Sequence, residues 1–242
     1  MKNGFTLVTS SRYSKMKRMT FNPLEVPNYG LQEAVRFLHI PSSTLHYWLR
    51  PSVGLVSPAG AARNQLSFKN LVECYVLEGL RVIHGVRVSA IRKAVDYLQT
   101  NFRSRHPLAD YELKTDGRHV FFFHQGVNLD ATMQGQMGLS GILDSYLRRI
   151  ERDFRKQHWV LYPFIRLEQM RSKEERPRIV SINPNVCFGM PVLAGTRITT
   201  AVLASRFLGG DSLPRLARSY DRPESEIAEA ISWETGKESI AA

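Results

Sequence analysis

The chain has 242 residues, a formal net charge of +11 and 43% hydrophobic residues. This length favours two small domains over one, and no apolar run approaches the ~18 to 20 residues that span a bilayer, which excludes a membrane-spanning protein. The two cysteines, Cys74 and Cys187, have no partner at zinc-binding spacing and build no disulfide scaffold, so we expect a reducing, cytoplasmic location. The positive charge predicts a polyanionic partner, because Lys and Arg that neutralise phosphates release counterions.

The positive charge is concentrated in the first part of the chain. Residues 1–24 contain no acidic residue, show no helical or strand periodicity and are rich in Ser, Lys and Arg, which predicts a flexible basic arm. The net charge is +5 for residues 1–24, +5 for 25–105, +2 for 106–178 and −1 for 179–242. The nucleic-acid partner is therefore expected at the N-terminal side.

A helix-turn-helix is predicted just after the arm, in "YGLQEAVRFLHIPSSTLHYWLR". Apolar residues spaced three and four apart give the first helix a core-facing side, and Ile40 fills the angle at the turn. Ser42 or Ser43 can cap a second helix that carries Leu45 and Trp48 toward the core and its polar side chains outward, as a recognition helix does. The residues predicted to contact DNA are Ser42, Ser43, Thr44, His46, Tyr47 and Arg50, with Arg63 and Asn64 on the following loop.

That loop, "RPSVGLVSPAGAARNQLSF", predicts a wing closed by a short strand at residues 66–68, and two more helices follow, the second with Ser89 as a possible cap. The stretches "EAVRFLHIPSSTLHYW", "GLV", "LSF" and "GVRVSAIRKAV" resemble the winged helix-turn-helix of the MerR class over roughly residues 28–100. His39 stands where that family often has Gly. The resemblance implies a domain at 25–105 that binds double-stranded DNA.

Residues 106–170 predict a connecting segment. "YELKTDGRHVFFF" alternates around Asp116-Gly117, which favours a β-hairpin with a two-residue turn. "LSGILDSYLRRIERDF", residues 139–154, has the apolar stripe of an amphipathic helix. The preferred interpretation is a core-facing helix, and the alternative is a dimerisation helix of a homodimer.

A charged stretch interrupted by Pro177 marks a boundary near 170–178, and a small domain is predicted at 171–242. It begins with a strand at 179–182 and an extended arm at 192–194, bent at Gly189 and Gly195. Three short amphipathic helices follow as a second helix-turn-helix. Their expected caps and stops are Thr199 or Thr200, Gly209-Gly210, Asp211 or Ser212, and Asp221 with Pro223. The predicted fold class is thus mainly α with small β elements.

This last segment carries the more specific resemblance. "INP…GMPVLAGTRI", "FLGGDSLPRLARSY" and "ESEIAEAI" closely resemble a small helix-turn-helix domain, long catalogued as of unknown function, of antitoxins of the VapB class, over roughly residues 178–233. Met190 stands where that family often has Lys. The resemblance implies a type II antitoxin that inhibits a PIN-like ribonuclease toxin and represses its own promoter. The toxin's active site would be a cluster of carboxylates holding a divalent metal.

The C-terminal domain is the predicted toxin-binding part, because its charge is slightly negative and it offers apolar residues. The predicted contacts are Val192, Leu193, Arg197, Phe207 and Trp233. No phosphate loop, metal-binding His pair or serine elbow occurs, so we expect neither catalysis nor a cofactor or metal. The alternatives are a stand-alone MerR-like regulator, a nuclease subunit completed in a complex, and a toxin held by the winged domain alone.

Overall fold

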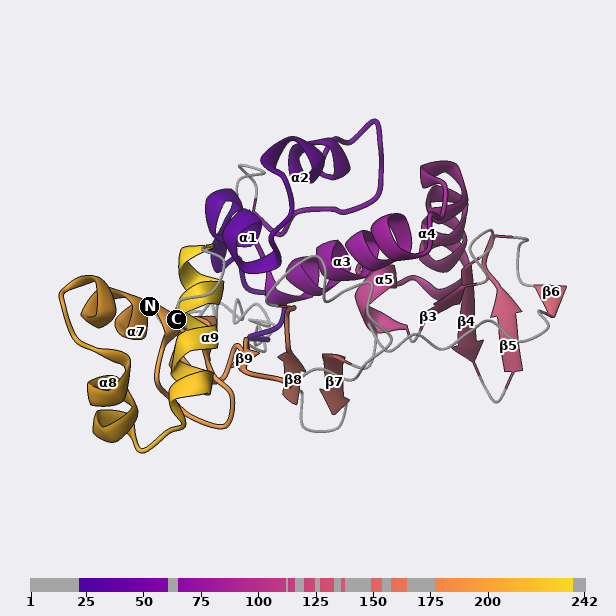
Figure 1. Cartoon of the computed structure of the whole chain (residues 1–242). Coiled ribbons are helices and arrows are strands. Elements are labelled where there is room, and N and C mark those ends of the chain that lie inside the picture. The colour runs from indigo at the N-terminus through magenta and orange to yellow at the C-terminus, as the bar shows by residue number, and fades with distance from the viewer. Residues whose placement is uncertain are drawn as a thin grey trace, which may run out of the picture.

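Helices dominate the structure, with small antiparallel strand groups between them (Figure 1), which confirms the predicted mixture of mainly α and small β elements. The structure is a computed structural model, and it describes residues 22–60, 65–111, 113–115, 120–124, 127–132, 136–137, 149–153, 158–164 and 177–236. Among these residues, no helix is both long and apolar enough to cross a bilayer.

The N-terminal part is a helical layer around one central helix. Strand β1 (Tyr29–Gly30) pairs antiparallel with β2 (Gln65–Leu66), and between them lie α1 (Leu31–Leu38) and α2 (Ser42–Trp48). They are followed by α3 (Phe68–Glu78), the π-helix η1 (Gly79–Ile83), α4 (Val88–Phe102) and the short α5 (Pro107–Asp110). Helix α3 is buried along almost its whole length, because the other elements surround it.

The helix ends in this part correct three sequence predictions. Pro41, and not Ser42 or Ser43, occupies the N-cap of α2, so both serines are already helical. Arg87 rather than Ser89 precedes α4. The predicted strand at 66–68 ends at Leu66, because the Ser67 side chain accepts a hydrogen bond from the Asn70 backbone N–H and so starts α3.

The central part contains two separate groups of strands. The first is a four-stranded antiparallel sheet in the order β3 (Leu113–Thr115), β4 (Val120–His124), β5 (Val127–Asp130), β6 (Gln136–Met137). The pairing of β3 with β4 confirms the predicted hairpin, whereas its predicted turn at Asp116-Gly117 lies outside the described residues.

The second group corrects the predicted helix at 139–154. Its residues 150–153 form a strand, β7 (Ile150–Asp153), that pairs antiparallel with β8 (His158–Leu161). The earlier part of that prediction, residues 139–148, lies outside the described residues, as does residue 154.

The C-terminal part has the predicted order of elements. Strands β9 (Val180–Ser181) and β10 (Val192–Leu193) pair antiparallel, with the 3-10 turn η3 (Cys187–Gly189) between them. Three helices follow: α7 (Thr200–Leu208), α8 (Leu213–Tyr220) and α9 (Glu224–Thr235). The Thr199 hydroxyl accepts the Val202 backbone N–H at 3.4 Å, which confirms Thr199 as the cap of α7. Gly195 has a φ of +76°, which confirms the predicted bend.

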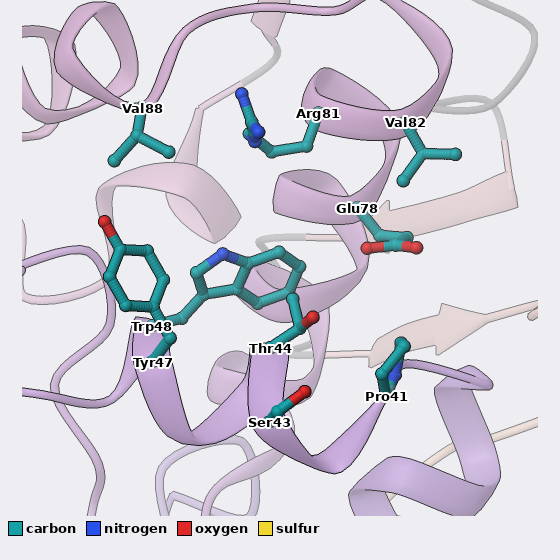
Figure 2. A pocket seen from close by; sticks show the side chains of 9 residues that line it. All are labelled: Pro41, Ser43, Thr44, Tyr47, Trp48, Glu78, Arg81, Val82 and Val88. Atoms are coloured by element: carbon teal, nitrogen blue, oxygen red, sulfur yellow. The ribbon is translucent and has the colours of Figure 1, made fainter.

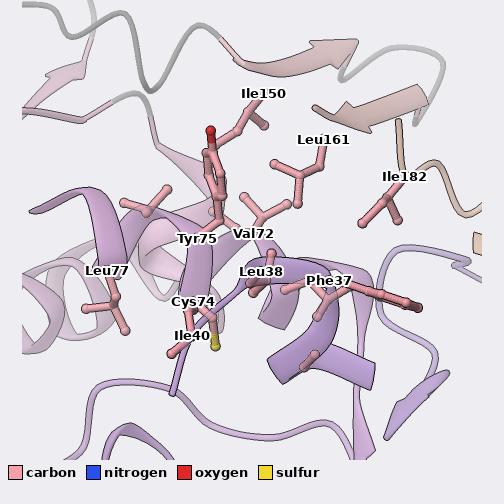
Figure 3. Packing of buried hydrophobic residues seen from close by; sticks show 14 of the residues in the cluster. Phe37, Leu38, Ile40, Val72, Cys74, Tyr75, Leu77, Ile150, Leu161 and Ile182 are labelled. Atoms are coloured by element: carbon pink, nitrogen blue, oxygen red, sulfur yellow. The ribbon is translucent and has the colours of Figure 1, made fainter. Parts of the chain in front are cut away.

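Buried residues from all three parts form one hydrophobic cluster. Figure 3 shows Ile150 and Leu161 lying over Tyr75 and Val72 of α3, with Ile182 farther along on the side of Phe37. A pair of backbone hydrogen bonds between Leu161 and Ile182, at 3.0 and 2.8 Å, attaches the C-terminal part to β8. The C-terminal helices therefore share a core with the N-terminal ones.

Candidate nucleic-acid interface

Helix α2 presents a polar side to solvent and an apolar side to the core. Leu45 and Trp48 are buried, as the sequence predicted. The residues predicted to contact DNA divide by burial: Ser43, His46, Tyr47 and Arg50 are exposed, and Ser42 and Thr44 are half-buried. Arg63 and Asn64 lie outside the described residues.

The angle between α1 and α2 is set by a turn of three residues. His39 has a φ of 54°, in the left-handed region that a non-glycine residue rarely adopts. Ile40 follows it and is 1% exposed, and Ala34 of α1 is fully buried, so the two helices can approach closely around Ile40. Burial lowers the pKa of His39, which favours its neutral ring.

A groove of about 420 Å³ lies beside α2. Figure 2 shows Thr44, Tyr47 and Trp48 of α2 on one side, and Glu78 of α3 with Arg81 and Val82 of the π-helix on the other. The Arg81 guanidinium donates a hydrogen bond to the Val86 carbonyl at 2.8 Å, which fixes the turn before α4. Burial raises the pKa of Glu78, and the neighbouring Arg81 opposes that shift.

Several exposed cations follow α2 or lie at the start of α4. Arg50, Arg87 and Lys93 are exposed, and none of them forms an ion pair with a described residue. Arg92 instead donates to the Val53 carbonyl at 2.7 Å and so ties the loop after α2 to α4. The exposed cations thus lie just after α2 and at the start of α4, whereas the sequence reasoning named none at α4.

The groove and the π-helix were missed at the sequence level. A π-helical segment often occurs at functional sites, but its residues, "GLRVI", continue the apolar spacing of α3 without a break. The one available signal was Gly79, a weak helix former at the point where the hydrogen-bond pattern changes.

The predicted toxin contacts need a correction. Val192, Leu193 and Trp233 are at most 1% exposed, since the C-terminal part uses them for its own core, and they have no surface to offer a partner. Phe207 is half-buried and Arg197 is exposed. The large apolar side chains that this part does expose are Phe188 (89%), Leu208 (67%) and Val202 (46%).

Phe188 is held outward by a strained loop. Cys187, Phe188 and Gly189 have φ values of 46°, 56° and 80°, so three consecutive residues are left-handed and two of them carry side chains. Asn28 donates a side-chain hydrogen bond to the Phe188 carbonyl at 2.6 Å, and the Cys187 thiol donates to the Arg197 carbonyl at 3.4 Å. The second bond places the backbone of Arg197 next to Cys187, and the side chains of Phe188 and Arg197 are both exposed.

No cluster of three or more His, Cys, Asp or Glu side chains that could hold a metal ion occurs in the part of the chain that the structure describes.

The C-terminal part matches a known protein family. Residues 180–233 match the family described as "Protein of unknown function (DUF433)". These residues run from β9 to α9 and include the Phe188 loop.

The rest of the chain is covered by a longer similarity. A Mycobacterium tuberculosis (strain ATCC 25618 / H37Rv) protein named "Putative antitoxin VapB45" is 27% identical over 235 residues, which are 86% of this chain and 93% of that protein. The crystal structure of Rv2018 from Mycobacterium tuberculosis is similar with a TM-score of 0.60 and 22% identity, over 85% of this chain and 98% of that one. The second similarity concerns the fold alone.

Proposed function

We propose that the protein is the antitoxin of a bacterial type II toxin–antitoxin system, which binds a PIN-like ribonuclease toxin and represses its own promoter. The observation that carries the proposal is the similarity to a protein named as an antitoxin along almost the full length of both chains. The match of residues 180–233 agrees with the antitoxin-type resemblance of that segment. An antitoxin acts by binding, so we propose no enzymatic activity and a cytoplasmic location.

The DNA-binding half of the proposal rests on α2. Its exposed face carries short polar side chains near its N-terminus and Arg50 just beyond its end, an arrangement that suits base contacts flanked by phosphate contacts. Arg87 and Lys93 extend the positive surface along α4. We propose a winged helix-turn-helix over residues 25–105 that binds double-stranded promoter DNA, with two copies of the chain on two half-sites.

The toxin-binding half rests on the surface formed by Phe188 and Arg197. An exposed aromatic residue on a loop held in a strained conformation loses little entropy on binding, and such residues are frequent hot spots of interfaces. Arg197, whose backbone carbonyl accepts the Cys187 thiol, is exposed and offers a cation to the carboxylates of a PIN-like active site. Phe188 and Arg197 replace the buried Val192, Leu193 and Trp233 as the proposed anchors, with Phe207 at the margin.

The test is co-expression of the full chain with the product of the neighbouring gene. The expected result is a complex that survives purification and suppresses RNA cleavage. F188A should release the toxin without lowering the melting temperature, because Phe188 makes almost no contact within the chain. V82A, which shortens an exposed apolar residue beside α2, is the matched control and should keep the toxin bound.

The opposite results lead to the alternative function. If no neighbouring gene product binds the chain or loses ribonuclease activity in its presence, the antitoxin proposal fails. Sequence-specific DNA binding would then favour a stand-alone MerR-like regulator. If V82A rather than F188A released the toxin, the winged domain would be the toxin-binding part.

A further inference from the structure

A second pocket lies away from the groove at α2. Its volume is about 490 Å³, and it is lined by the end of α4, by the segment that follows α4, and by the loop before β2. The lining residues that bear on its chemistry are Glu25, Ser57, Gln99, Arg103, Arg105 and His106. None of them was singled out by the sequence reasoning, and the proposed antitoxin function does not use them.

His106 is the most constrained of these residues. Its side chain is 10% exposed, and its Nδ1 lies 3.1 Å from Oε2 of Glu73, a carboxylate that is 1% exposed. Because Nδ1 is occupied by Glu73, Nε2 is the ring nitrogen that remains for a ligand. A buried carboxylate behind an imidazole fixes the orientation of the ring, as in many sites where histidine binds a ligand.

Asn70 joins this pair to the loop before β2. Its side-chain amide donates to Glu73 Oε2 at 3.0 Å and to the Ser57 carbonyl at 2.9 Å. Burial raises the pKa of Glu73, and the hydrogen bonds from His106 and Asn70 oppose that shift. The ring of His106 is therefore connected, through two buried side chains, to a residue on the opposite wall of the pocket.

The charges around the pocket are predominantly positive. Arg103 and Arg105 are exposed on either side of Ser104, and neither forms an ion pair with a described residue. Arg103 ends α4 with a φ of 54°, so the chain reverses there, and Arg103 and Arg105 both line the pocket. The nearby carboxylates of Glu25 and Asp110 form ion pairs with Lys69, whose Nζ lies 2.9 Å from Glu25 Oε1 and 3.0 Å from Asp110 Oδ1.

We propose that this pocket binds a phosphate-type anion. The guanidinium groups of Arg103 and Arg105 hold its oxygens, the Gln99 amide donates from α4, and the His106 ring, held by Glu73 through Nδ1, presents Nε2 to the anion. A cation is disfavoured by the two arginines. The anion is either a free phosphate compound or a phosphate of the DNA backbone, and bound anion stabilises the loop at Ser57 through Asn70.

The test is a titration of the full chain with inorganic phosphate at constant ionic strength, followed by the ¹⁵N signals of the His106 ring, which H106Q assigns. We expect a saturable shift that chloride does not reproduce. R103Q/R105Q should weaken phosphate binding by at least about tenfold, because two charge-assisted hydrogen bonds are lost. R215Q/R218Q, which removes the same charge from exposed positions on α8 outside the pocket, is the control and should leave the affinity unchanged.

A second arm uses a short duplex of DNA in place of phosphate. A duplex that shifts the same ring signals and displaces phosphate identifies the anion as backbone phosphate. A duplex that leaves them unchanged identifies a free phosphate compound. A response to phosphate that never saturates, or that persists in R103Q/R105Q, overturns the proposal, and this outcome is independent of whether a toxin binds the chain.

Discussion

Trp233 packs the C-terminal helix α9 against α1 and the turn of the predicted helix-turn-helix. Its ring stacks on Phe37 of α1 with centroids 5.9 Å apart and meets the edge of His39 at 5.7 Å. The next residue, Glu234, binds the Arg36 guanidinium at 2.8 Å and accepts the Thr200 hydroxyl at 2.5 Å. Removing the indole should therefore weaken both parts together.

The expected magnitude follows from its surroundings. Truncation of a buried Trp to Ala costs about 3–5 kcal/mol. The indole N–H of Trp233 has no hydrogen-bond partner among the residues that the structure describes, so its loss offsets about 1 kcal/mol of that cost. We expect W233A to lower the free energy of unfolding by about 2–4 kcal/mol, whereas W233F, which retains a ring against Phe37 and removes the unpaired N–H, should cost only about 1 kcal/mol.

The assay is guanidinium unfolding of the full chain, followed by far-ultraviolet circular dichroism. L208A truncates a residue that is 67% exposed and should change the free energy of unfolding by less than about 0.5 kcal/mol. A W233A variant as stable as L208A, or a W233F variant as unstable as W233A, would refute the proposed energetic role of the ring.

Three further outcomes are expected. T44A/R50A should weaken promoter binding in a mobility-shift assay with little change in melting temperature, since neither side chain is part of the core; undiminished binding would place the interface elsewhere. G195V should destabilise the chain by about 1 kcal/mol or more in a melting experiment, because the φ of residue 195 is +76° and the space around it is open, so the cost is conformational. G195N should cost less, because Asn adopts the left-handed region more readily than Val does. Burial raises the pKa of the Cys74 thiol, so in the native chain only the half-buried Cys187 should react with a thiol reagent. Both cysteines should react in guanidinium, and two fast reactions in the native state would contradict the burial of Cys74.

The features predicted correctly from the sequence are those that depend on residues close together in the chain. The turn at His39, the burial of Leu45 and Trp48, the cap at Thr199 and the bend at Gly195 each depend on a few neighbouring residues, and all are present.

The errors concern contacts between distant segments. Residues 150–153 have helical spacing, but pairing with β8 makes them a strand. The apolar residues at 192, 193 and 233 could belong to the core or to an interface, and the sequence does not distinguish the two. The structure shows them buried by other segments of the same chain. The pairing of Glu73 with His106, 33 residues further along, leaves no local pattern in the sequence.

The contact between α1 and α9 also has a consequence for synthesis. Arg36 and Glu234 are 198 residues apart in the chain. At a translation rate of about 5–20 residues per second, α1 waits roughly 10–40 s for the helix that covers it. During that interval the ring of Phe37 lacks its stacking partner and is exposed to other chains and to chaperones. Folding of the N-terminal helices is thus completed late, when the C-terminal segment leaves the ribosome.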